Sequence, residues 1–191
     1  ASGRTTELNE AGPVVDEADL QAFWQDLEEI LPESKLLICS GSLPQGVAPK
    51  FYYQLISRCK ELGVKVFFDS SGPALLEGIK AKPYFIKPNQ DEVELLLKRK
   101  VANPLEIKDA LSDLEKLGIP IIVISLGEEG AIFYSKDQPL FWGRAEAEQV
   151  QSTAGCGDAL VASFAASLLA GRSWEEAVRW SIAAATATVE L

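Results

Sequence analysis

The stretch IIVISLGEEG, residues 121–130, runs from a continuous apolar segment into a polar turn that contains two glycines. Its first four residues are all apolar, which is typical of a parallel strand buried on both faces. Three more runs share this character, namely LLICS (36–40), VKVFFD (64–69) and YFIK (84–87). Because these runs alternate with segments of helical periodicity, the sequence predicts an α/β fold. The expected architecture is a doubly wound, mostly parallel sheet with helices on both faces.

Helix start and stop signals flank the segments between the strands. They are Asp16, Pro49, Gly63, Asn103 with Pro104 and Glu106, Gly118, and Ser173 with Glu176. A further helix is predicted over 157–170, where the helix formers Ala and Leu dominate. Two short apolar segments, 131–135 and 139–143, are close enough in sequence to form a β-hairpin.

The composition excludes several classes of function. The formal net charge is −10, whereas a nucleic-acid surface needs a basic stripe, so we expect no nucleic-acid partner. The chain has no histidine, which rules out Ser-His-Asp triads and His-containing zinc sites within it. No apolar run is long enough for a membrane span, and three widely spaced cysteines are typical of a reduced cytoplasmic protein. The chain begins inside a polar stretch without methionine, and we expect it to be a fragment of a longer protein.

Polar residues follow each of the four predicted parallel strands, in segments 40–44, 69–72, 87–90 and 125–127. Polar, glycine-rich loops are common after any strand. Ligands of open α/β sheets, however, bind beyond the carboxyl ends of the strands. The four segments together offer hydroxyls, amides, a lysine and glycines, which are groups that hold phosphates and sugars. We therefore expect the binding site at this edge of the sheet.

The segment GCGDAL, residues 155–160, places a carboxylate where a glycine loop becomes a helix. Glycines let the backbone approach a ligand, and the unpaired N–H groups of a helix start attract anions. Two interpretations of Asp158 are equally supported by this segment alone. It could cap the helix, as Asp often does, or accept a proton from a nucleophilic hydroxyl. The segment matches neither G-x-G-x-x-G nor the Walker A pattern.

Five motifs in order resemble those of the PfkB (ribokinase-like) carbohydrate kinases. They are SGSLPQG (40–46), DSSGPAL (69–75), KPNQDE (87–92), VISLGEEGA (123–131) and QSTAGCGDALVASF (151–164). The similarity is greatest to the phosphosugar branch, which comprises 1-phosphofructokinase, minor-type 6-phosphofructokinase and tagatose-6-phosphate kinase. It implies a ribokinase-like fold in which residues 1–13 end the lid strand and lead back from it. Residues 14–191 would form the α/β nucleotide-binding core, incomplete at both ends, with the lid sheet largely missing.

The family motif G-A-G-D falls on Gly155, Cys156, Gly157 and Asp158. The resemblance implies that these residues form an anion hole and that Asp158 is the catalytic base facing the substrate. Cys156 replaces the usual Ala, and we expect a small packing side chain there rather than a reactive thiol. The resemblance gives no role to Asp69, which we expect to be structural.

The resemblance also implies which residues would bind Mg²⁺, ATP and the phosphosugar. Asn89 and Glu92 of N-x-x-E would organise Mg²⁺, while Lys87 would face the phosphates of ATP, with Gly157 beside them. Gly41 and Ser42 would contact the phosphosugar. The nucleotide would be held by the turn of Ser125, Leu126, Gly127, Glu128, Glu129 and Gly130.

These assignments predict an ATP- and Mg²⁺-dependent kinase that phosphorylates a hydroxyl of a ketohexose phosphate to give a bisphosphate. Two alternatives remain, a kinase for an unphosphorylated sugar or nucleoside of the same family, and a nucleotide-binding regulatory module without turnover. Asp158 disfavours the module, since binding alone needs no base. The full-length protein is expected to be a cytoplasmic homodimer with no nucleic-acid or membrane partner.

Overall fold

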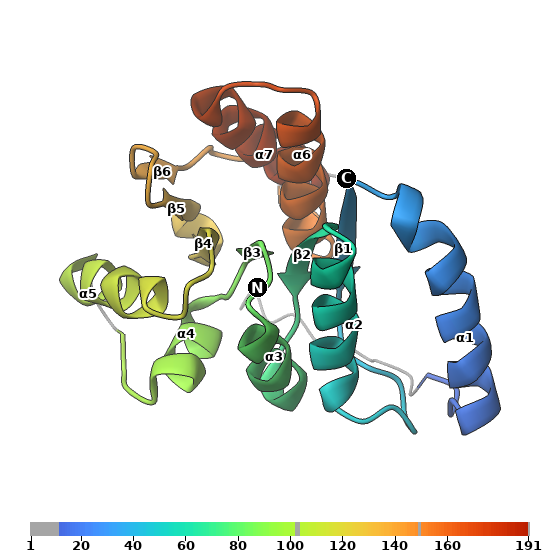
Figure 1. The fold of residues 1–191 in the computed structure, drawn as a ribbon. Helices are drawn as coiled ribbons and strands as arrows, with labels where there is room; N and C mark the ends of the chain where they lie inside the picture. The colour runs from blue at the N-terminus through green and yellow to red at the C-terminus, as the bar shows by residue number, and fades with distance from the viewer. Residues whose placement is uncertain (1–11, 102–103, 149, 191) are drawn as a thin grey trace.

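A computed structural model of the chain describes residues 12–101, 104–148 and 150–190. Within them, six strands form one sheet in the order β1-β2-β3-β4-β5-β6 (Figure 1). Strands β1 to β4 run parallel, β5 runs antiparallel to β4, and β6 runs antiparallel to β5. The strands are β1 (Leu36–Ser40), β2 (Lys65–Asp69), β3 (Phe85–Ile86), β4 (Ile121–Ser125), β5 (Ala131–Ser135) and β6 (Phe141–Gly143). The predicted α/β class, the mostly parallel sheet and the hairpin are confirmed.

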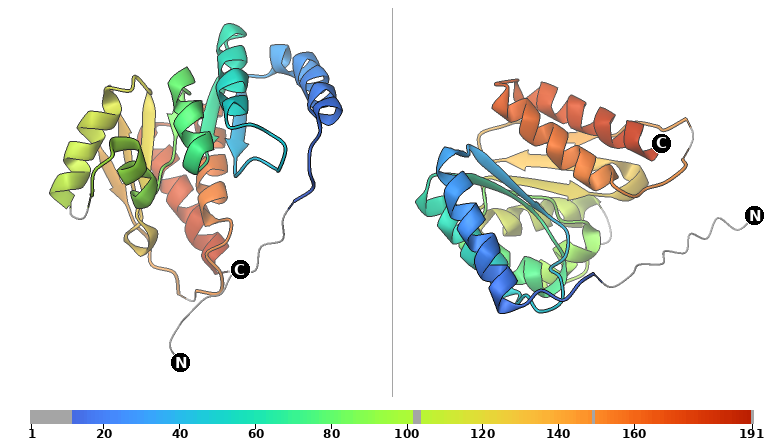
Figure 2. Two further views of the ribbon diagram at one scale, coloured as in Figure 1. Left: turned by 90° about the horizontal axis from the view of Figure 1, so that it is seen from below. Right: turned by 90° about the vertical axis from the view of Figure 1, so that its right-hand side faces the viewer.

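Helices cover both faces of the sheet, as predicted (Figure 2). Their bounds are α1 (Glu17–Ile30), α2 (Lys50–Glu61), α3 (Gly72–Gly78), α4 (Gln90–Leu97), α5 (Pro104–Glu115), α6 (Cys156–Leu169) and α7 (Trp174–Val189). Three short 3₁₀ turns accompany them, η1 (Leu31–Glu33), η2 (Ile79–Ala81) and η3 (Gly127–Glu129). The helices between successive parallel strands, α2 to α5, lie on one face, and the pair α6 and α7 covers the other.

The side chains of each strand alternate between these two layers. Phe68 on β2 packs into the core under α2 and α3, whereas its neighbour Phe67 packs under α6. Phe67 stacks on Phe85 of β3 with 4.4 Å between ring centroids, and Phe164 of α6 lies 5.7 Å from Phe85. Both faces of the central strands are therefore buried, which fixes α6 against the sheet.

Several helix boundaries follow the predicted signals. Asp16 caps α1 through the amide of Asp19, and Ser173 and Glu176 form a capping box at α7. Each such cap stabilises a helix by about 1 kcal/mol. Gly63 and Gly118 follow their helices in left-handed conformations, with φ of 74° and 72°. The predicted start signal at Asn103 lies outside the described residues.

Strand β1 differs from the prediction that it is buried on both faces. Ile38 is 40% exposed, because β1 ends the sheet and, in the described part of the chain, only β2 pairs with it. Strands β2, β3 and β4 have neighbours on both sides and show the expected burial. No helix among the described residues is both long and apolar enough to cross a lipid bilayer.

Candidate active site

The carboxyl ends of the parallel strands meet at one edge of the sheet, where the sequence places its polar segments. Ser40, the last residue of β1, lies opposite Asp69, the last residue of β2. Beyond β3, Asn89 forms a parallel bridge with Ser125 at the end of β4. The predicted segments thus form one continuous edge.

Asp158 enters this edge from the other layer of the fold. It is the third residue of α6, and the N-cap is Gly155, which adopts a left-handed conformation with φ of 79°. The interpretation of Asp158 as the helix cap is therefore wrong. Its Oδ1 atom instead accepts a short hydrogen bond of 2.5 Å from the Ser40 hydroxyl. The loop before α6 is tied down by the amides of Gln151 and Ser152, which donate to the carbonyl of Val189.

Lys87, just after β3, is buried at the centre of the site, with 8% of its surface exposed. Its Nζ atom lies 3.1 Å from Oδ2 of Asp69. A Cβ atom added at Gly157 would lie only 3.2 Å from the same Nζ atom, so the glycine lets the ammonium approach the first turn of α6. Lys87 is thus a buried residue, although it stands just beyond the end of its strand. An ammonium beside the N-terminus of a helix suits an anion such as a phosphoryl group.

Asp69, which the sequence analysis expected to be structural, lies in contact with Lys87 at this edge of the sheet. Burial raises the pKa of its carboxyl, because it disfavours the ionised form. The Lys87 ammonium opposes this shift, and the negative charge of Asp158 adds to it. The signal available in the sequence was positional, since Asp69 is the last residue of β2 just as Ser40 is the last residue of β1.

Asn89 and Glu92 form a capping box at the start of α4. The Asn89 side chain accepts from the amide of Glu92 at 2.9 Å, and Oε2 of Glu92 accepts from the amide of Asn89 at 2.8 Å. Burial raises the pKa of Glu92, the hydrogen bond from Asn89 opposes this, and the charge of Asp69 adds to it. Asn89 and Glu92 therefore cap α4, and their role towards a metal stays a prediction.

The side chains of Asn89 and Glu92 fit Mg²⁺ only if phosphate oxygens and water supply its other ligands. In the part of the chain that the structure describes, no three acidic, cysteine or histidine side chains form a metal-binding group. Mg²⁺ usually keeps several waters and takes one or two carboxylates together with phosphate oxygens. The site therefore suits a magnesium ion that arrives with a nucleotide and is held through Glu92, Asn89 and water.

The turn Ser125–Gly130 extends the edge beyond Asn89. The amide of Ser125 donates to the carbonyl of Pro88, and the amide of Leu126 donates to that of Gly130. Gly130 has φ of 87°, and a Cβ atom there would lie 2.0 Å from the carbonyl oxygen of Gly143 on β6. Only glycine fits, so the turn is held tightly against the hairpin of β5 and β6.

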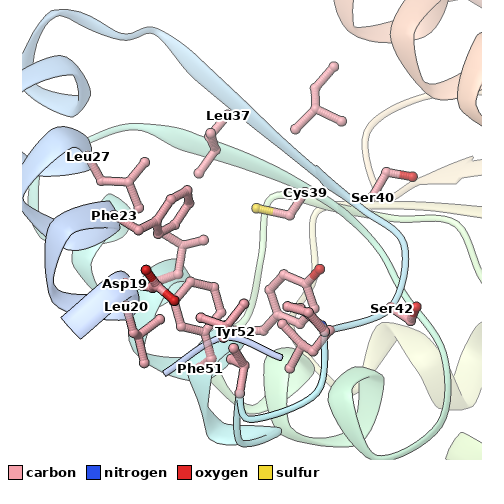
Figure 3. Close-up of a pocket in the computed structure, with 16 residues that line it drawn as sticks. Asp19, Leu20, Phe23, Leu27, Leu37, Cys39, Ser40, Ser42, Phe51 and Tyr52 are labelled. Atoms are coloured by element: carbon pink, nitrogen blue, oxygen red, sulfur yellow. The ribbon is translucent and has the colours of Figure 1, made fainter. Parts of the chain in front are cut away.

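Gly41 and Ser42 follow β1, and Ser42 lines a pocket of about 460 Å³ between α1, β1 and α2. Figure 3 shows the apolar side chains of Phe23 and Leu27 at one end of this pocket and Ser40 and Ser42 at the other. The structure thus places Gly41 and Ser42 next to Ser40, on the β1 side of Asp158.

The comparison with known sequences gives one family. Residues 2–191 match the family described as pfkB family carbohydrate kinase. The chain is 37% identical over 163 residues to the 1-phosphofructokinase of Vibrio cholerae. This alignment covers 85% of this chain and 51% of that protein. It is 34% identical over 180 residues to the tagatose-6-phosphate kinase of Staphylococcus epidermidis, covering 93% and 58% respectively. The chain therefore spans about half to three fifths of the length of these relatives.

Solved structures show the same likeness. Phosphofructokinase-2 from Escherichia coli, in complex with substrates and products, matches with a TM-score of 0.87 at 30% identity, over 98% of this chain and 61% of that one. Arabidopsis thaliana ribokinase, complexed with ribose and ATP, has the same fold, with a TM-score of 0.74 at 24% identity. The match covers 95% of this chain and 55% of the ribokinase chain. Since the family match extends over residues 2–191, the chain belongs to the pfkB family of carbohydrate kinases.

Proposed function

We propose that the full-length protein transfers the γ-phosphoryl group of MgATP to a hydroxyl of a ketohexose phosphate, giving a bisphosphate. The observation that carries this proposal is the meeting of the Asp158 carboxylate, the N-terminus of α6 and the buried Lys87 ammonium at one edge of the sheet. Relatives named 1-phosphofructokinase and tagatose-6-phosphate kinase support a phosphorylated sugar as the acceptor.

Asp158 is the general base of this reaction. It accepts the proton of the attacking hydroxyl, and such a group typically contributes roughly 10²–10⁴-fold to the rate. The first turn of α6, from Gly155 to Gly157, offers its unpaired N–H groups to the charge that develops on the phosphoryl oxygens. Lys87 adds a positive charge beside Gly157. Phosphoryl transfer depends mostly on such positioning and electrostatics, so no covalent intermediate is required.

The cofactors have their own places along the edge. The turn from Ser125 to Gly130 contacts the nucleotide, and Lys87 faces its phosphates. Mg²⁺, when bound, neutralises phosphate charge. Glu92 and Asn89 hold that ion through water. Gly41 and Ser42 contact the sugar phosphate on the β1 side of Asp158.

We further propose that the full-length protein is a cytoplasmic homodimer. Cys39, Cys59 and Cys156 are all free thiols, which suits a reducing compartment. Phosphofructokinase-2 from Escherichia coli has a tetrameric inhibited form, so a relative assembles into oligomers.

A coupled assay of ADP release by the full-length protein tests the proposed reaction. The acceptors are fructose 1-phosphate, fructose 6-phosphate, tagatose 6-phosphate, the corresponding free sugars and nucleosides. Turnover with a phosphorylated ketohexose supports the proposal. Turnover confined to free sugars or nucleosides would identify the alternative kinase, and nucleotide binding without any turnover would identify a regulatory module.

A further inference from the structure

A single hydrogen bond joins the two layers of the fold at the site. The Ser40 hydroxyl donates to Oδ1 of Asp158 at 2.5 Å, between residues 118 positions apart in the chain. We propose that Ser40 is a positioning residue that fixes the orientation of the Asp158 carboxylate, so that the second oxygen faces the acceptor hydroxyl. This inference rests on the proposed function, because it needs Asp158 to be the base.

The chemistry of an aspartate explains why such a partner is needed. The carboxylate rotates about a torsion with broad, roughly two-fold preferences, so rotamer preference alone orients it poorly. A serine hydroxyl has one proton to donate, and an ionised carboxylate has two accepting oxygens. The bond from Ser40 therefore occupies Oδ1 and leaves Oδ2 for the substrate.

Ser40 is held on a rigid support. It is the last residue of β1 and pairs in register with Asp69. The next residue is fixed on both sides, because the amide of Gly41 donates to the carbonyl of Asp69 at 2.9 Å. The carbonyl of Gly41 accepts from Ser70 Oγ at 2.9 Å and from the Tyr52 hydroxyl at 3.1 Å.

Asp158 is supported equally well from the other layer. The turn of α6 that follows it carries Leu160 and Val161, and one turn later comes Phe164, all buried against the sheet. The hydrogen bond thus connects two fixed points. Ser40 is solvent-exposed, so its hydroxyl does not need this bond merely to satisfy a buried polar group. We attribute the bond to the orientation of Asp158.

The test compares three variants of the full-length protein, Ser40→Ala, Ser40→Thr and Ser135→Ala. Ser135 is a matched control, since it ends β5 opposite Ile121, at the amino end of β4. We expect Ser40→Ala to lower kcat by about 10- to 100-fold, the scale of a misplaced catalytic group. The affinity for ATP, measured by calorimetry, and KM for the sugar phosphate should each change by less than about two-fold. Ser40→Thr keeps the hydroxyl and should restore most of kcat, and Ser135→Ala should be unchanged.

A double-mutant cycle separates positioning from a general structural effect. In the Asp158→Asn background, Ser40→Ala should change kcat by less than about two-fold, since residues that act through one another are not additive. Additive losses, a normal kcat in Ser40→Ala, or failure of Ser40→Thr to rescue would each overturn the role of Ser40. If Asp158→Asn alone keeps a normal kcat, Asp158 is not the base and the proposed function fails. If Asp158→Asn lowers kcat but Ser40→Ala does not, only the positioning role of Ser40 fails.

Discussion

Four side chains concentrate charge at the site, the carboxylates of Asp69, Glu92 and Asp158 and the ammonium of Lys87. Burial raises the pKa of Asp69 and of Glu92, and each of these carboxyls is influenced by Lys87. Lys87 is thus a shared partner, with Asp69 in direct contact at 3.1 Å. Three negative groups around one positive group favour a ligand that brings its own cations, as MgATP does.

Replacing Asp158 by Asn tests the base without disturbing the helix. Gly155 is the N-cap of α6, so the cap survives, and the Asn oxygen can still accept from Ser40. We expect kcat to fall by roughly two to four orders of magnitude because the proton acceptor is lost. ATP affinity, measured by calorimetry, should change little. A variant that folds normally by circular dichroism and keeps its kcat would show that Asp158 is not the base.

Asp69→Asn should change how stability depends on pH. The pKa of Asp69 is raised in the folded protein, whereas the unfolded chain releases this proton at the ordinary value of about 3.9. The contribution of Asp69 to stability is therefore complete below that value and is lost as pH rises through the folded pKa. Asn does not titrate, so the free energy of unfolding of the parent should fall relative to that of the variant over this range. Urea titrations at a series of pH values measure the difference, and a constant difference would contradict the shift.

At the scale of elements, local signals account for most of what could be predicted. Continuous apolar runs identified β2 and β4, because both are buried on both faces by neighbouring layers. Capping residues correctly predicted the starts of α1 and α7, because a cap forms hydrogen bonds within the first turn of its own helix. The edge position of β1, the burial of Lys87 and the ion pair between Lys87 and Asp69 depend on contacts between distant elements. No local pattern encodes those contacts.

Glu92→Gln at the start of α4 separates the cap from the metal. Glutamine serves at the third helical position of a capping box as well as glutamate does, so the bonds with Asn89 can persist. The charge that favours Mg²⁺ is lost, and we expect a higher Mg²⁺ concentration to be needed for half-maximal activity. A titration of activity with Mg²⁺ at saturating ATP measures this. An unchanged curve would remove Glu92 from the metal site.

On the scale of the whole molecule, the chain matches only part of the length of each relative. The chain spans 51% to 61% of the length of its relatives. A polypeptide of residues 1–191 should therefore bind ATP but show negligible kinase activity beside the full-length protein. Calorimetry and the coupled assay on the same sample provide both measurements. Full turnover by the short polypeptide would place the whole sugar site within these residues.

The outer edge of β1 has a consequence for handling the protein. In the described part of the chain, no strand pairs with this edge, and Ile38 is 40% exposed beside it. Unpaired strand edges act as templates for aggregation, and charged side chains protect against it. A polypeptide of residues 1–191 should therefore scatter more light as its concentration rises. Ile38→Lys should suppress this aggregation, and equal scattering by the two polypeptides would show that the β1 edge is not its cause.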